Sequence, residues 1–121
     1  MTFLGYQIIT NADTLKEKPD MVRRFVAATL KGLEYAKANP DDTIDMLVKS
    51  GADMAKDRAY VLSALKGVTL ALMESDASKG KPAGWQSTEE WQGTLDTMVK
   101  YGGLDKAPTL NQLFTSDFLP K

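Results

Sequence analysis

The stretch from Lys18 to Lys49 constrains the fold most, because it carries the pattern of two consecutive helices separated by a sharp break. Apolar and small residues recur in it at three- and four-residue steps, which places them on one face of a helix. Pro19 suits the first helical turn, where its missing N–H costs nothing. Pro40 restricts Asn39 to extended backbone, which ends the first helix and opens the second. The stretch therefore predicts helices over residues 19–38 and 41–49.

The first of these helices is predicted to be the packing centre of a helical domain. Ala28, Gly32 and Ala36 are spaced four residues apart, so another backbone can approach closely there, with Tyr35 beside this small-residue groove. The apolar face expected to turn inward consists of Val22, Phe25, Val26, Thr29, Leu30, Leu33 and Ala36.

The residues before this stretch predict one β-strand, over residues 3–10. The segment FLGYQIIT has β-branched and aromatic residues on both faces, as a strand buried from both sides would have. Asn11 or Asp13 can cap the short helical turn that follows. No second confident strand is found, and an unpaired strand leaves backbone groups without partners. We therefore expect the strand to pair outside the chain, with a missing part of a larger protein or with a second copy in a homodimer.

Two further helices are predicted, over residues 57–73 and 88–101. Asp57 is the expected N-cap of the first helix. Ser87 and Glu90 form the expected capping box of the second, in which the Glu90 N–H donates to the Ser87 side chain while the Glu90 carboxylate reaches back. Both helices keep apolar residues at helical spacing.

The end of the chain is predicted to be mostly irregular. Gly102 is the expected left-handed residue after the helix over 88–101. Residues 109–114 can form one more short helix, and Phe118 and Leu119 are expected to dock on the body. The predicted fold class is mainly α, a single domain of residues 1–121 with about four principal helices and one N-terminal strand.

Composition excludes several classes of function. The 121 residues are 43% hydrophobic and 26% charged, with 15 basic and 16 acidic residues. A net charge of −1 without a basic cluster argues against a nucleic-acid partner, which requires a concentrated positive field. The chain has no cysteine and no histidine, so disulfides, thiolate nucleophiles and imidazole chemistry are excluded within it.

The polar motifs predict no catalytic and no metal-binding residue. The acidic pairs Asp41-Asp42 and Glu89-Glu90 lie in the first turns of predicted helices, where carboxylates offset the helix dipole. No glycine-rich phosphate loop or calcium-loop spacing is present. Two aromatic residues are the candidates for ligand binding, by stacking on a ligand: Tyr6 in the strand and Trp85 in a loop after Gly84, with core packing as the alternative for each.

Several motifs together carry a family resemblance. GYQIITN leads into KPDMVRRFVAATLKGLEYAKANPDDTIDMLVK, GKPAGWQSTEEWQGTLDTMVKYGGL follows, and LFTSDFLP closes the chain. Over roughly Gly5 to Pro120 the sequence resembles the C-terminal part of NMT1/THI5-like periplasmic solute-binding proteins, which serve ABC importers. The matching residues look structural rather than ligand-binding; they are Pro19, Phe25, Asn39, Pro40, Trp91 and Gly102.

The resemblance implies a two-lobed α/β binding protein of the type II class, of which this chain is a portion. Its ligand would be a small organic molecule such as a thiamine-precursor pyrimidine, a sulfonate or nitrate, and its partner an ABC permease. No cofactor is expected. The implied location is periplasmic or extracytoplasmic, although Met1-Thr2-Phe3 does not begin a recognisable signal peptide. The first half of the family pattern is absent.

Two alternatives remain open beside the binding protein, which is expected not to be an enzyme. The same family includes pyrimidine synthases that use pyridoxal phosphate and a histidine, which this chain lacks. The third interpretation is a small helical domain that dimerises through the strand over residues 3–10.

Overall fold

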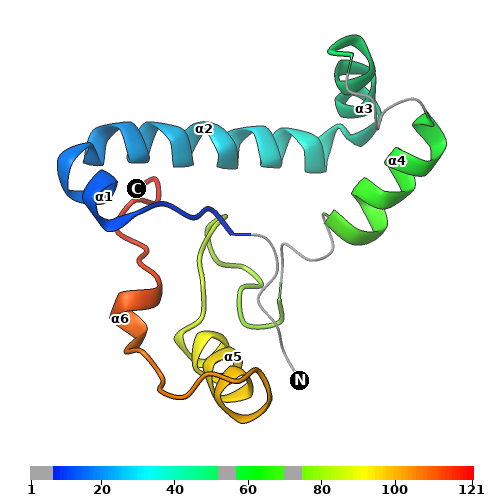
Figure 1. Cartoon of the computed structure of the whole chain (residues 1–121). Helices are drawn as coiled ribbons and strands as arrows, with labels where there is room; N and C mark the ends of the chain where they lie inside the picture. Colours follow the sequence, from blue (N-terminus) through cyan, green and yellow to red (C-terminus); the bar gives the residue numbers. More distant parts are fainter. Residues whose placement is uncertain (1–6, 52–56, 70–74) are drawn as a thin grey trace.

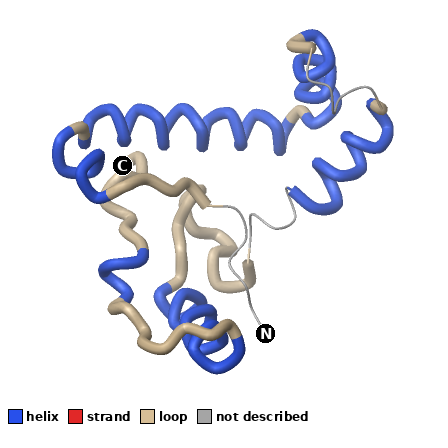
Figure 2. The backbone as a smooth tube through the Cα atoms, viewed as in Figure 1, coloured by secondary structure: helices blue, strands red, loops and turns tan. Residues whose placement is uncertain are grey.

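The computed structural model describes residues 7–51, 57–69 and 75–121. Over these residues the chain consists of helices joined by loops and turns, and none of them forms a β-strand (Figure 2). The mainly helical character predicted from the sequence is therefore confirmed. The elements are α1 (Ala12–Glu17), α2 (Pro19–Ala38), α3 (Pro40–Lys49), α4 (Arg58–Ala64), the π-helical turn η2 (Leu65–Thr69), α5 (Thr88–Tyr101) and α6 (Leu110–Leu113).

The break between α2 and α3 is made by the backbone. Pro19 stands in the first turn of α2 and Pro40 in the first turn of α3, where neither removes a needed donor. The Asn39 N–H donates to the Tyr35 carbonyl at 2.8 Å. The Asn39 carbonyl in turn accepts from the Thr43 N–H at 3.0 Å. Hydrogen bonding thus continues through the bend while the helix direction changes.

Side-chain caps begin three of the helices. Asn11, Asp57 and Ser87 each accept a hydrogen bond from the backbone N–H three residues later, at 2.7, 3.0 and 3.3 Å. These bonds satisfy donors that the first turn of a helix leaves free. Asn11, rather than Asp13, is therefore the cap of α1, and Asp57 caps α4 as predicted.

The capping box predicted for α5 is only half right. Ser87 accepts from the Glu90 N–H, but its hydroxyl donates to the Glu89 carboxylate at 2.7 Å. The Glu90 carboxylate instead accepts from the Ser75 hydroxyl at 3.0 Å. A loop residue distant in the sequence has therefore taken the carboxylate that the local motif would have used.

The C-terminal end of α5 corrects a second prediction. Gly102 has φ −95°, whereas Gly103 has φ +73° and is the left-handed residue. The Leu104 N–H then folds back to donate to the Met98 carbonyl at 3.3 Å. Gly102 instead avoids a steric clash, because a Cβ there would lie 2.9 Å from the Met98 carbonyl oxygen.

The helix predicted over residues 57–73 is shorter and changes its winding. The α-helical part ends at Ala64, and residues 65–69 form the π-helical turn η2. Residues 70–73 lie outside the described part of the chain. The strand predicted over residues 3–10 is not found in the part of that range that the structure describes. Residues 3–6 lie outside the described residues, and residues 7–10 form no strand because no described segment supplies a partner strand.

The helices surround α2 unevenly (Figure 1). In that view α2 runs across the top, with α3 and α4 at its C-terminal end and α5 and α6 on its lower side. The α2 helix packs on α1 and α3, α3 packs on α4, and α5 packs on α6. None of the described helices is long and apolar enough to cross a membrane. Among the residues that the structure describes, few apolar side chains are buried: Val22, Val26, Ala36, Ile44 and Leu95.

This core leaves a large surface exposed. The chain has 9030 Å² of accessible surface. A compact monomer of the same mass would expose about 6,500 Å². An excess of roughly two-fifths over that scaling means that many apolar side chains face solvent.

The inward face predicted for α2 is also too broad. Val22, Val26 and Ala36 are buried, but Phe25 is 58% exposed and Thr29 is exposed as well. The Thr29 hydroxyl bonds to the Phe25 carbonyl on its own helix at 2.9 Å. Helical spacing groups these residues on one side, but the neighbours of α2 cover only part of that side.

Candidate functional site

The loop over residues 75–87 carries the candidate site, because it holds Trp85. Ser75 and Ser78 tie its first turn together: the Ser75 N–H donates to the Ser78 hydroxyl at 2.8 Å, and the Ser78 N–H donates to the Ser75 hydroxyl at 3.2 Å. The bond from Ser75 to Glu90 fastens this turn to α5. The loop is therefore held at one end by the helix that follows it.

Gly84 fixes the other end of the loop. It has φ +83°, a conformation that favours glycine. A Cβ at this position would lie 2.9 Å from a methyl carbon of Leu119 and 3.1 Å from one of Leu30. The backbone is thus pressed against α2 and the C-terminal segment. The Trp85 N–H then donates to the Pro82 carbonyl at 3.0 Å, which sets the direction in which the indole leaves the chain.

Trp85 itself is half-buried beside a cation. The Lys81 ammonium lies 5.4 Å from the centre of the indole ring. Such a pair joins an electron-rich aromatic face to a positive charge. An aromatic ring with one nearby charged group can orient a flat ligand, particularly one with polar or anionic substituents. The predicted ligand-binding role of Trp85 stays a prediction.

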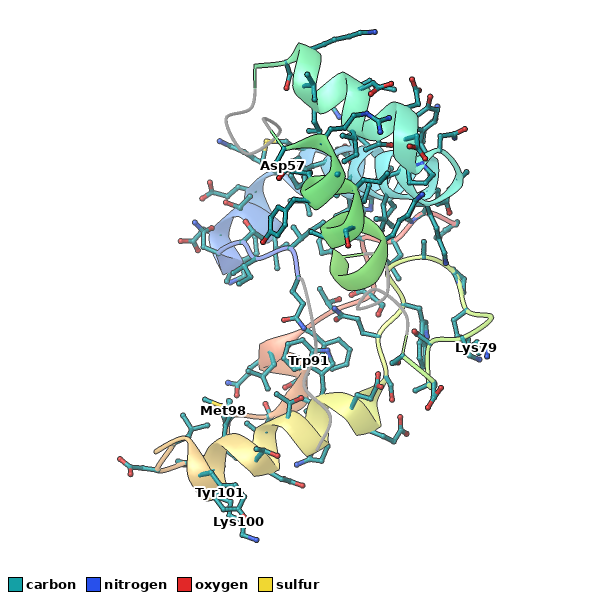
Figure 3. The ribbon with its side chains drawn as sticks, turned by 90° about the vertical axis from the view of Figure 1, so that its right-hand side faces the viewer. Asp57, Lys79, Trp91, Met98, Lys100 and Tyr101 are labelled. Carbon is teal, nitrogen blue, oxygen red and sulfur yellow. The ribbon has the colours of Figure 1, made fainter. Side chains whose placement is uncertain are left out.

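The second tryptophan has a different setting. The Trp91 ring stacks on Phe114, with ring centres 5.1 Å apart and planes 5° from parallel. Its indole N–H donates to the Gln86 side-chain oxygen at 3.1 Å. Figure 3 shows Trp91 at the N-terminal part of α5, facing α6, while Lys100 and Tyr101 lie at the opposite end of the helix. Trp91 therefore joins α5 to α6 and to the loop, a packing role.

The C-terminal segment completes the surroundings of the loop. Phe118 and Leu119 are half-buried, and the Arg23 guanidinium lies 5.3 Å from the Phe118 ring centre. The predicted docking of these two residues on the body is confirmed. Tyr6, the other predicted ligand-binding residue, lies outside the described residues.

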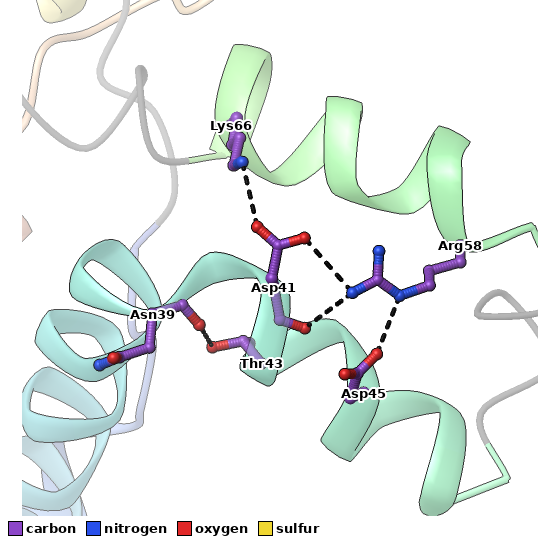
Figure 4. A network of polar contacts seen from close by, with 6 residues as sticks. All are labelled: Asn39, Asp41, Thr43, Asp45, Arg58 and Lys66. Atoms are coloured by element: carbon purple, nitrogen blue, oxygen red, sulfur yellow. Dashed lines mark hydrogen bonds and ion pairs between the residues drawn. The ribbon is translucent and has the colours of Figure 1, made fainter.

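A charged cluster joins α3 to α4 (Figure 4). Arg58 donates to the Asp45 carboxylate at 2.8 Å and to the Asp41 carboxylate at 3.3 Å. Lys66 approaches the other oxygen of Asp41 at 3.4 Å. These side chains are about half exposed, which limits the strength of the pairs. The cluster orients two helices and offers no free charge for chemistry.

The same contacts shift two ionisation equilibria. Lys66, and after it Arg58, lower the pKa of the Asp41 carboxyl by hydrogen bonding and charge. Asp45 and then Asp41 raise the pKa of Arg58. The position of Asp41 at a helix start follows from the sequence, but its two cationic partners do not, because they lie 17 and 25 residues away. No local spacing could have found them.

Two further pKa shifts come from hydroxyl groups. The Tyr35 hydroxyl donates a hydrogen bond to Asp42, which raises the pKa of Tyr35. The Ser87 hydroxyl, donating to Glu89, lowers the pKa of that carboxyl. Within the described residues no group of acidic side chains is placed to hold a metal ion.

Comparison with known proteins agrees with the resemblance noted in the sequence. The model of the family described as NMT1/THI5 like matches residues 1–43. The chain is also similar to the riboflavin-binding protein RibY of Chloroflexus aurantiacus, with 24% identity over 106 residues. That match covers 88% of this chain and 30% of the relative, so the chain spans less than a third of its length. No solved structure matches the chain.

Proposed function

We propose that this chain, whose first 43 residues carry the NMT1/THI5-like pattern, is a portion of a solute-binding protein of an ABC importer. The supporting observation is a match to a protein named as binding riboflavin. The match covers 88% of this chain at 24% identity. The chain would act as a single unit, the C-terminal part of a type II binding protein. The rest of that protein would supply the opposite wall of the ligand site.

The proposed ligand is a small organic molecule with a flat ring. Trp85 offers an indole face for stacking, and Lys81 stands where it can meet a polar substituent. Riboflavin and a thiamine-precursor pyrimidine both have a planar heteroaromatic ring, whereas taurine and nitrate do not. Trp85 therefore favours the aromatic members of the ligand classes that the family implies.

The proposed mechanism is non-covalent. The two lobes would close around the ligand, and the closed protein would deliver it to a membrane permease outside the cytoplasm. The segment over residues 3–10 would contribute to this larger fold by pairing with a strand beyond the chain. In its described part, Ile8 is 48% and Ile9 89% exposed, which leaves apolar surface for such a partner. A homodimer through the same segment is the alternative.

The proposal is tested by fluorescence, since the chain has only two tryptophans. The Trp91→Phe variant leaves Trp85 as the sole indole reporter. Titration with riboflavin is expected to quench it saturably, and taurine is expected to have no effect. Trp85→Ala removes this reporter, so the affinities of the variants are compared through the fluorescence of riboflavin itself. Trp85→Ala should weaken riboflavin binding roughly tenfold or more, the cost of losing one stacking contact.

Trp91→Phe is the matched control, because Trp91 packs on Phe114 and is not proposed to contact the ligand. Equal riboflavin affinity of the Trp85→Ala and Trp91→Phe variants would refute the role of Trp85. Absence of any saturable response to riboflavin, pyrimidine and taurine would refute solute binding by this chain. A pyridoxal absorbance in the purified protein would favour the synthase alternative instead.

A further inference from the structure

Lys81 is a cation that the loop over residues 75–87 holds beside Trp85 without a counter-ion among the described residues. Its ammonium lies 5.4 Å from the centre of the indole ring. None of the ion pairs between described residues includes Lys81. The Glu89 and Glu90 carboxylates at the start of α5 each accept from a serine hydroxyl instead. The charge of Lys81 is therefore available to a group that approaches from outside this part of the chain.

The backbone on both sides of Lys81 is fixed. The Lys81 N–H donates to the Ser78 carbonyl at 2.9 Å, which attaches the residue to the first turn of the loop. Pro82 follows directly, and its ring removes freedom about φ. The Pro82 carbonyl then accepts from the Trp85 N–H at 3.0 Å. The cation and the indole therefore leave the chain from one short hydrogen-bonded segment, which sets the spacing between them.

The contact with the indole holds the Lys81 ammonium only weakly. Lys81 is exposed, and a cation over an exposed aromatic ring gains little because water hydrates the charge. An ammonium group forms a stronger, charge-assisted hydrogen bond with a phosphate oxygen. The flexible four-carbon stem of lysine allows the ammonium to turn toward such an acceptor. Lys81 can therefore exchange its contact with the indole for one with an anionic substituent of a ligand whose ring stacks on Trp85.

We propose that Lys81 is a specificity-determining residue of the candidate site, which favours a planar heteroaromatic ligand that carries a phosphate group over the same ring without one. This inference rests on the proposed function, because it requires a ligand ring that stacks on Trp85. A neutral ligand meets the cation only through hydroxyl or carbonyl groups, whereas a phosphate also neutralises its charge. The net charge of the chain is only −1, so it adds little repulsion against an anionic ligand.

Lys79 provides a matched control for Lys81. Both residues are exposed on the same loop, and replacing either with glutamine removes one positive charge. The cation–aromatic pairs of the described residues include Lys81 but not Lys79. Figure 3 shows Lys79 at the outer edge of the loop. The two variants therefore have the same net charge and differ in whether the lost charge lies beside Trp85.

Riboflavin and riboflavin 5′-phosphate are the probes, because they share one ring system and differ by the phosphate. Each is titrated with the chain, and the fluorescence of the flavin ring is followed. At low salt the wild-type chain should bind the phosphate ester about fivefold more tightly than riboflavin, the strength of one exposed ion pair. Lys81→Gln should bring this ratio of affinities close to unity, and Lys79→Gln should preserve it. A role of Lys81 in loop structure alone would weaken both ligands and leave the ratio unchanged, which would overturn the proposal.

The remaining outcomes separate this inference from the proposed function. Added salt should lower the wild-type ratio toward that of Lys81→Gln, because exposed charges are screened. Equal affinity of the wild-type chain for the two flavins would overturn the role of Lys81 and leave solute binding intact. A preference lost in Lys79→Gln and kept in Lys81→Gln would overturn it as well. Binding of neither flavin would overturn the inference, and the pyrimidine and taurine titrations would then decide the proposed function.

Discussion

Replacing Gly84 with alanine tests the anchoring of the candidate site. Two costs are expected. Gly84 has φ +83°, and a non-glycine residue in that region pays about 1–2 kcal/mol. The new Cβ would also lie 2.9 Å from Leu119 and 3.1 Å from Leu30. Both contacts are with the flexible ends of leucine side chains, so displacement should add only about 1 kcal/mol. The expected loss of unfolding free energy is therefore about 2–3 kcal/mol.

Gly80 supplies the control for this experiment. It lies on the same loop with φ +75°, but a Cβ there would meet no atom within 4 Å. Gly80→Ala should pay only the backbone cost of about 1–2 kcal/mol. The difference between the two variants isolates the packing of the loop on α2 and the C-terminal segment.

Urea denaturation followed by tryptophan fluorescence measures both variants, with Trp91→Phe as the background so that Trp85 reports. The Gly84→Ala midpoint should lie below that of Gly80→Ala, with unchanged slopes. Equal midpoints would refute the argument, because they would mean that Leu30 and Leu119 do not press on the backbone at Gly84.

Two further predictions concern the start of α5 and the contact between α3 and α4. Ser87→Ala removes the cap of α5 and should lower the free energy of unfolding by about 1 kcal/mol in the same urea assay, whereas Ser116→Ala should have little effect. The pKa of Asp41 is lowered in the folded chain, so its stabilising contribution is complete above its ordinary value of 3.8 and is lost as the pH falls through the lower folded value. Asp41→Asn should therefore flatten the acid limb of a thermal-stability profile, and an unchanged limb would contradict the pairing with Lys66 and Arg58.

Local sequence signals predicted the helices because their causes lie within a few residues. Pro19, Asn39 and Pro40 set the bounds of α2 and the start of α3, and Asp57 caps α4 through a bond to a backbone group three residues away. Such signals involve one turn of chain, which a sequence displays completely. Their success extends to the mainly helical fold.

The sequence could not show contacts between distant segments. Where a side chain has several possible hydrogen-bond or packing partners, only the fold decides which one it takes. Glu90 has the right spacing to bond its own cap, yet it accepts from Ser75 in the preceding loop. Phe25 has the spacing of an inward residue, yet its side chain is 58% exposed. These outcomes depend on tertiary contacts, which periodicity does not encode.

The distribution of burial also bears on the proposed function. Buried polar groups are hydrogen-bonded: in the described residues no buried side-chain nitrogen or oxygen lacks a hydrogen-bond partner. Apolar side chains are less well covered, since Ile9, Phe25 and Tyr101 are all more than half exposed. A chain with satisfied hydrogen bonds and exposed apolar side chains has formed its local structure. Its exposed apolar surface is of the kind that a partner buries. Trp85 is also half-buried, with Lys81 at its ring, and we propose that it forms one wall of a ligand site that the rest of a longer protein completes.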